Sequence, residues 1–346
     1  MKTMLNGLTL VAIGILASCG GSGSSSSGSS KPLASITINA SNADSVAKGA
    51  VSSQAVADTG STSTNTVKSA TLITDSTQSY SALSLAMKHL RMAEKLPIPT
   101  NIGTRAITST SYFCNDGTVA PISTTANTYT YTFDDADSSG TFSSGDTFSI
   151  SYYSCIFPST TITLAGSTYL ALNSYRSSAT TPPTPSDPDS GSITLSYNNF
   201  SITDSTPSTG VTISFDGSMT MSYSDNGTLF TASMTGTSFT ATVSGIGSIT
   251  YTNFTFTSTE TSSTETFYVD MSISMTPTGG TTGTVNISTP VTFSGPVGGN
   301  PTSGQMRIDG ANGSYMTITA NNDNTVTIVI FDGTTTTTKT KAWDAI

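Results

Sequence analysis

The sequence has few of the residues on which enzyme active sites usually depend. Its 346 residues include one histidine, three cysteines and one tryptophan, and only 10% of them are charged. A single histidine excludes the two-histidine metalloprotease helix, and neither a Gly-x-Ser-x-Gly elbow nor a Gly-Lys-Ser/Thr phosphate loop is present. His89 has no orienting partner or nucleophile in its local sequence, which a catalytic base would need. We therefore expect that the protein is not an enzyme.

Long hydrophobic runs are also lacking. The apolar run at residues 8–16 (LTLVAIGIL) is shorter than the roughly 20 residues that a membrane-spanning helix needs. It follows Lys2 and precedes small residues, so residues 1–18 are predicted to be a removable export signal. Leu-Ala-Ser-Cys at its end resembles the bacterial lipobox, which implies that Cys19 is acylated and becomes the mature N-terminus. The alternative is an ordinary signal with an incidental cysteine.

The residues after Cys19 are typical of a tether. Residues 20–30 (GGSGSSSSGSS) can bury almost no surface, so we expect residues 19–33 to form the lipidated cysteine and a flexible linker. Multiple acyl chains hold a protein at a membrane more firmly than one. Gly20 is not the aspartate that resembles an inner-membrane retention signal, so the predicted location is the outer membrane of the cell envelope. The sequence does not distinguish the periplasmic leaflet of that membrane from the surface-facing one.

Positive charge is scarce in the middle of the chain. Residues 107–306 contain thirteen acids and one base, Arg176, and the whole chain has a formal net charge of −9. Phosphate backbones would be repelled, which argues against a nucleic-acid partner and favours cations or neutral surfaces. Solubility of an exported protein also accounts for the acidic bias.

The abundant residues indicate strands. Serine and threonine make up roughly a third of the chain, well above ordinary usage. From residue 107 onward they alternate with Val, Ile, Tyr and Phe, which predicts an antiparallel β domain over residues 101–346. Separate strands are expected at 228–234 and 239–243, and Gly217 marks either a hairpin or a bulge. The Pro-rich stretch at 177–190 is interpreted as a surface loop in preference to a domain linker.

Residues 34–100 form a predicted helical segment. Alanines and valines recur at helical spacing from residue 42 to 58, and a longer amphipathic pattern covers residues 76–96, ending before Pro97. Its apolar stripe and basic residues suggest packing on the acidic sheet. The predicted fold is therefore mainly β: a large curved antiparallel sheet or open barrel with one or two N-terminal helices packed on it. A two-sheet stack and a β-solenoid are alternatives.

Two cysteines remain once Cys19 is assigned to lipid. Cys114 and Cys155 each lie in an aromatic-flanked run that looks like a strand, and adjacent strands would bring them into bonding range. Exported chains can form disulfides, so we expect a Cys114–Cys155 bond; two buried free thiols are the alternative.

One polar segment between these cysteines has the spacing of a calcium loop. In residues 135–146 (DADSSGTFSSGD), oxygen-bearing residues stand at positions 1, 3, 5, 9 and 12, and glycine stands at position 6. The predicted ligands are Asp135, Asp137, Ser139, Thr141, Ser143 and Asp146, with Thr141 offering its carbonyl. Two features differ from an EF-hand: Asp146 replaces the bidentate glutamate, and both flanks look like strands. The alternative is a polar hairpin loop whose residues serve turn geometry.

Several motifs resemble an uncharacterised family of β-rich, Ser/Thr-rich proteobacterial lipoproteins. They are Cys-Asn-Asp-Gly at 114–117, the runs 135–140 and 144–147, the strand ending at Cys155, and the C-terminal run 301–343. The resemblance implies an envelope location and a β architecture, and it brings no activity or catalytic residues.

Together these features predict a non-catalytic envelope lipoprotein that acts as a binding or scaffolding module, with calcium as its one candidate cofactor. The expected partners are the membrane, through the lipid anchor, and an envelope protein, glycan or apolar ligand. A periplasmic carrier or chaperone of apolar ligands is one alternative, and a surface adhesin is another.

Overall fold

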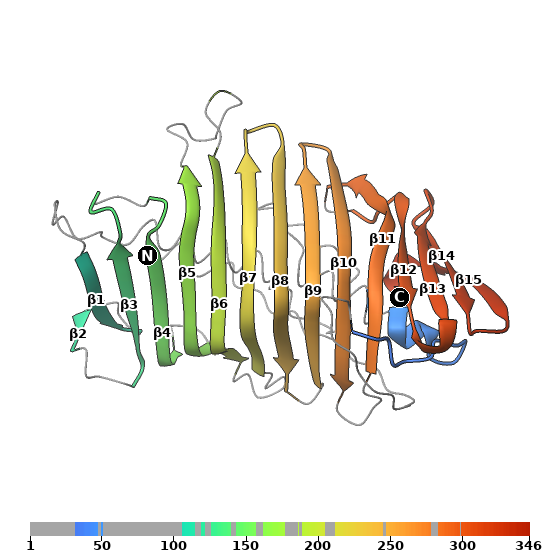
Figure 1. Cartoon of the computed structure of the whole chain (residues 1–346), viewed down its shortest axis with the longest axis horizontal. Coiled ribbons are helices and arrows are strands. Elements are labelled where there is room, and N and C mark those ends of the chain that lie inside the picture. Colours follow the sequence, from blue (N-terminus) through green and yellow to red (C-terminus); the bar gives the residue numbers. More distant parts are fainter. Residues whose placement is uncertain are drawn as a thin grey trace. The chain divides into compact units, whose positions relative to one another are not determined.

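The computed structural model describes residues 32–47, 50, 106–114, 119–121, 126–139, 143–156, 162–176, 186, 189–204, 212–244, 247–277, 283–297 and 299–346 (Figure 1). Several predicted features lie outside these residues: the export signal, Cys19, the helix at 76–96 with His89, and Thr141. Within the described ranges, no helix is both long enough and apolar enough to cross a membrane.

The described chain is mainly β and forms one antiparallel sheet that does not close, which confirms the predicted fold class. Neighbouring strands follow the order β15-β14-β13-β12-β11-β10-β9-β8-β7-β6-β5-β4-β3-β1-β2. Their bounds are β1 (Ala106–Phe113), β2 (Val119–Ala120), β3 (Thr128–Asp135), β4 (Thr147–Ile156), β5 (Ile162–Arg176), β6 (Asp189–Asp204), β7 (Thr212–Asp225), β8 (Phe230–Val243), β9 (Gly247–Glu260), β10 (Thr264–Pro277), β11 (Gly283–Pro296), β12 (Ser303–Asp309), β13 (Tyr315–Ala320), β14 (Thr325–Phe331) and β15 (Thr336–Ala342).

The strands correct one sequence interpretation and decide between the two alternatives left for Gly217. The two strands expected at 228–234 and 239–243 are one strand, β8, because the residues between them continue the extended backbone. Gly217 lies inside β7 with a φ of 116°, where the pairing with β6 shifts register, so it belongs to a bulge and not to a hairpin. Bulges also interrupt the β4–β5 and β5–β6 pairings; each bends its strand locally and increases its twist.

The Pro-rich stretch follows β5 and precedes β6. These strands pair in antiparallel fashion, with Arg176 opposite Ser190, so the stretch connects two neighbours of the same sheet.

The chain comprises two compact units. Unit 1 contains residues up to 85 together with 228–238 and 246–346, and unit 2 contains residues 86–227 and 239–245. In unit 2, the inward positions of β3 to β7 carry mainly aromatic and aliphatic side chains, and Tyr197 contacts both Phe200 and Phe215 at ring-centroid distances of 5.7 Å. The alternating outward positions carry hydroxyls that pair across strands, such as Ser109 of β1 with Thr132 of β3 at 2.7 Å.

In unit 1, an N-terminal segment is bound along one end of β11 to β13 (Figure 1). We call residues 32–47 the strap. The Ser35 N–H donates to the Thr284 carbonyl at 2.8 Å, and the Ala311 N–H donates to the Ile36 carbonyl at 2.7 Å. Ile36 and Ile38 are buried, and a short helix follows at residues 43–47, within the helix expected from residue 42. The rest of that predicted helix, apart from residue 50, lies outside the described residues.

The predicted disulfide between Cys114 and Cys155 is confirmed, with their Cα atoms 5.5 Å apart. The expectation that adjacent strands would carry the two cysteines is wrong, because β3 lies between β1 and β4 in the sheet. Cys114 directly follows β1 and Cys155 lies near the end of β4, beyond the first residue of β3. The two side chains therefore meet just before Thr128, the first residue of β3.

Candidate metal centre

The strand registers of unit 2 bring two aspartates of the predicted calcium loop together. Asp135 ends β3 and continues its inward-facing positions after Phe133, while Asp146 stands directly before β4, two residues from the inward-facing Phe148. Side chains alternate between the two faces of a strand, so both carboxylates point to the buried face. Asp135 is 2% exposed and Asp146 is 0% exposed.

Backbone pairing with β5 fixes the position of Asp146. The Leu172 N–H donates to the Asp146 carbonyl at 2.9 Å, and the Gly145 N–H donates to the Leu172 carbonyl. Gly145 has a φ of 98°, a left-handed conformation that glycine adopts without strain. The loop therefore returns to the sheet one residue before β4 begins.

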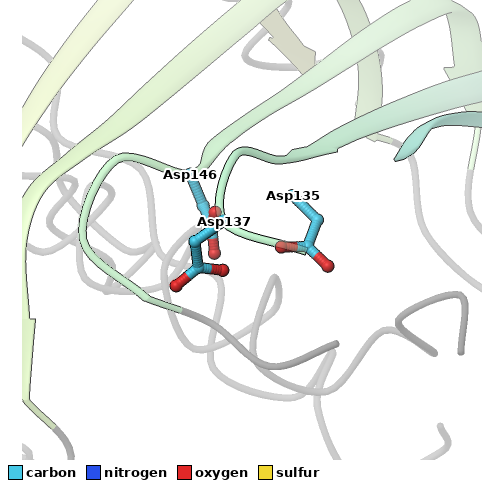
Figure 2. Close-up of side chains that lie close together, drawn as sticks. All are labelled: Asp135, Asp137 and Asp146. Atoms are coloured by element: carbon cyan, nitrogen blue, oxygen red, sulfur yellow. The ribbon is translucent and has the colours of Figure 1, made fainter. Parts of the chain in front are cut away.

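Asp137 lies on the exposed side of the same loop. Asp135, Asp137 and Asp146 can each offer one carboxylate oxygen such that all three atoms lie within 4.8 Å of one another. Figure 2 shows Asp137 beside Asp146, with Asp135 close by on the other side of the turn. The sequence spacing thus correctly identified three acids that meet in space.

Internal hydrogen bonds hold these carboxylates. Asp146 accepts from the Ala136 N–H through Oδ1 and from the Ser143 N–H through Oδ2, both at 2.8 Å. The Ser143 hydroxyl lies 2.8 Å from Asp137 Oδ2 and 3.2 Å from Asp146 Oδ2. The Ser139 N–H is shared between Asp135 and Asp137, at 3.1 and 3.0 Å.

The surroundings shift the pKa values of the Asp137 and Asp146 carboxyl groups in opposite directions. Burial raises the pKa of Asp146, although the N–H donors from Ala136 and Ser143 oppose this. Hydrogen bonds from Ser139 and Ser143 lower the pKa of the exposed Asp137 carboxyl. The negative charge of Asp135 contributes to the rise at Asp146.

Of the six predicted ligands, five lie in the described residues. The three aspartates converge, and Ser139 and Ser143 are close to them, but both serines act here as hydrogen-bond donors to carboxylates. Thr141 lies outside the described residues. The N–H of Ala136 was not anticipated as a partner of Asp146, because backbone donors leave no signal in a residue pattern.

This chemistry suits a hard cation better than proton transfer. Carboxylate and hydroxyl oxygens are the ligands that Ca²⁺ prefers. A catalytic acid or base must reach a substrate proton, whereas the Asp146 side chain has no exposed surface.

No protein-family model, curated protein or solved structure matches the chain. The resemblance to β-rich lipoproteins therefore stays a prediction, and the loop is interpreted from its own geometry.

Proposed function

We propose that this protein is a non-catalytic lipoprotein of the cell envelope, a binding or scaffolding module whose sheet is stabilised by calcium. The observation that carries the calcium assignment is the convergence of Asp135, Asp137 and Asp146, two of them buried, in a loop with calcium-type spacing. Three carboxylates this close repel one another when ionised, and a divalent cation among them would turn that repulsion into attraction.

The position of the loop supports a structural role for the ion. It joins β3 to β4 at one end of these strands, whereas the Cys114–Cys155 disulfide ties the region together at the other end. A cation bound by Asp135 of β3 and by Asp146 before β4 would clamp this hairpin at the end that the disulfide does not reach. A disulfide is the crosslink expected of a module in an oxidising compartment.

Calorimetric titration of the full chain with calcium tests the assignment. We expect saturable heat that is lost in Asp137→Asn, which removes an exposed ligand without disturbing a buried one. Asp216→Asn is the matched control, because Asp216 is an exposed aspartate of the same unit outside the loop. Absence of saturable heat in the unmodified chain, or equal heat in both variants, would contradict the calcium site.

The envelope assignment depends on the export signal and on Cys19. If Cys19 is acylated, the protein should leave membranes in detergent and stay with them in high salt, since acyl chains are held by hydrophobic burial. Release by salt alone, or a Cys19→Ser variant that fractionates in the same way, would refute the anchor.

A further inference from the structure

Unit 1 carries a polar and aromatic patch on the outward face of β12 to β14. The outer-face patch consists of Arg307, Asp309, Tyr315 and Phe331. Cross-strand pairing places Asp309 opposite Tyr315 and Tyr315 opposite Phe331, so these three residues form one row. Arg307 lies in the next row, two residues before Asp309 on the same strand. The inward residues beside them, such as Ile308, form the core, so the patch faces away from it.

Contacts within the patch hold its only base in one orientation. Arg307 Nε donates to Asp309 Oδ1 at 2.8 Å, and the guanidinium carbon lies 4.0 Å from the centre of the Tyr315 ring. The side chains of Arg307 and Asp309 are 40% and 44% exposed. Among the residues that the structure describes, neither the terminal nitrogens of Arg307 nor the second oxygen of Asp309 makes a further hydrogen bond.

An aromatic surface adjoins this ion pair. The rings of Tyr315 and Phe331 are partly exposed, with centroids 5.3 Å apart. The row of Asp309, Tyr315 and Phe331 continues with a neutral residue on each side. Asn286 of β11 lies opposite Asp309, and Thr336 of β15 lies opposite Phe331. Asn286 is itself held, since its Oδ1 accepts from the Ser272 hydroxyl at 2.5 Å.

The charge of the patch selects the class of ligand. Arg307 and Asp309 neutralise each other, so the patch has no net charge to attract an anion or a cation. It combines partly exposed aromatic surface with a guanidinium donor and a carboxylate acceptor, fixed side by side. Charge-assisted hydrogen bonds of this kind are about twice as strong as neutral ones.

We infer that the outer-face patch binds a neutral saccharide. A sugar ring has an apolar face of C–H groups, which packs on an aromatic ring such as the partly exposed Phe331, since the Arg307 guanidinium already lies over Tyr315. Its rim of hydroxyls both donates and accepts hydrogen bonds. Two neighbouring hydroxyls match the patch: one accepts from the terminal nitrogens of Arg307, and the other donates to Asp309. This inference deepens the proposed binding role and rests on it.

Calorimetry on the full chain tests the inference with four probes: cellohexaose, maltohexaose, the hexamer of N-acetylglucosamine, and hexagalacturonate as the charged counterpart. At least one neutral hexamer should bind saturably. Asp309→Asn removes the carboxylate, and Phe331→Leu removes the ring while keeping an apolar side chain; each should weaken binding about tenfold or more. Thr338→Ala, on the same outward face beyond the patch, is the matched control and should bind like the unmodified chain.

Three outcomes would overturn the inference. One is no saturable heat with any neutral hexamer, and another is binding that survives both patch variants. The third is tighter binding of hexagalacturonate than of the neutral hexamers, which would make Arg307 a carboxylate receptor. Thermal melts of each variant separate lost binding from lost folding. Calcium binding at residues 135–146 has its own titration, so failure of one proposal is distinguishable from failure of the other.

Discussion

Replacing Asp146 by asparagine tests both the fold and the metal centre. The substitution keeps the shape of the side chain but leaves one acceptor oxygen where the carboxylate has two. The Ala136 N–H and the Ser143 N–H each donate to a different oxygen of Asp146, so the asparagine amide must face one of these donors with its own N–H₂. One part-buried N–H then loses its partner.

The cost follows from these contacts. A hydrogen bond to a charged group contributes about 1.5–3 kcal/mol, and water replaces the lost acceptor only in part, because both hydrogen bonds are part-buried. Removing the charge also relieves repulsion from Asp135, which offsets part of the loss. We therefore expect the calcium-free variant to be less stable by about 1–2 kcal/mol. With calcium at a hundred times its dissociation constant, the difference should grow by about 2.7 kcal/mol, because the variant no longer gains from the ion.

Urea denaturation of the full chain, with EDTA and with excess calcium, measures both quantities. Asp216→Asn is the matched control and should respond to calcium like the unmodified chain. The reasoning is wrong if Asp146→Asn is as stable as the unmodified chain in EDTA. The metal centre is refuted if calcium stabilises Asp146→Asn and the unmodified chain equally.

Four further predictions follow from other contacts. Gly310→Ala should destabilise unit 1 by about 1–3 kcal/mol in urea, because the added Cβ would lie 2.5 Å from the Ile36 carbonyl oxygen of the strap. Replacing Cys114 and Cys155 by serine should cost about 4 kcal/mol in thermal unfolding, the loop-closure value for a sequence separation of 41. Asp44→Asn should cost less than about 1 kcal/mol at neutral pH, because the partly exposed Asp44 is hydrogen-bonded to lysines of β15. On acidification, calcium affinity should start to fall while the pH is still above 3.8, the ordinary pKa of an aspartate, because burial raises the pKa of Asp146 above that value.

Three of these predictions have a control or an outcome that would contradict them. Gly313→Ala has open space around its Cβ and should show only the strain of its φ of 71°, without loosening the strap. Lys341 donates to Asp44 and thereby lowers the pKa of that carboxyl, so the bridge stabilises the fold above pH 3.8 and the contribution is lost as the pH falls below it. A difference between Asp44→Asn and the unmodified chain that persists in stronger acid would contradict this pairing. Calcium affinity that stays constant down to pH 3.8 would exclude Asp146 as a ligand.

Much of the strand pattern could be predicted from alternation alone. The alternation of Met316 and Ile318 with polar residues is typical of a half-buried strand, and β13 covers these residues with one face buried. β8 was divided wrongly, because Gly236 among polar residues resembles a turn in the sequence. Extended pairing overrides such local preferences.

The sequence predicted which acids form the candidate metal centre, but not how deeply they are buried. The spacing of Asp135, Asp137 and Asp146 identified the three acids, since they belong to one short loop. Their burial was not predictable, because it depends on which face of β3 and β4 is covered. The residues of the outer-face patch form no sequence motif, because they come from three strands. They lie together only because of the register in which β12, β13 and β14 pair.

The sequence by itself determined the alternating strands, the three converging acids, and the cysteines available to pair, because each depends on local spacing or on residue type. Only the tertiary structure decided the order of the strands, the passage of the disulfide across the end of β3, and the binding of the strap to β11. It also decided the meeting of Arg307, Asp309, Tyr315 and Phe331. The physical reason is that register between strands is set by burial of one face and by contacts distant in sequence, and neither is encoded at any single position.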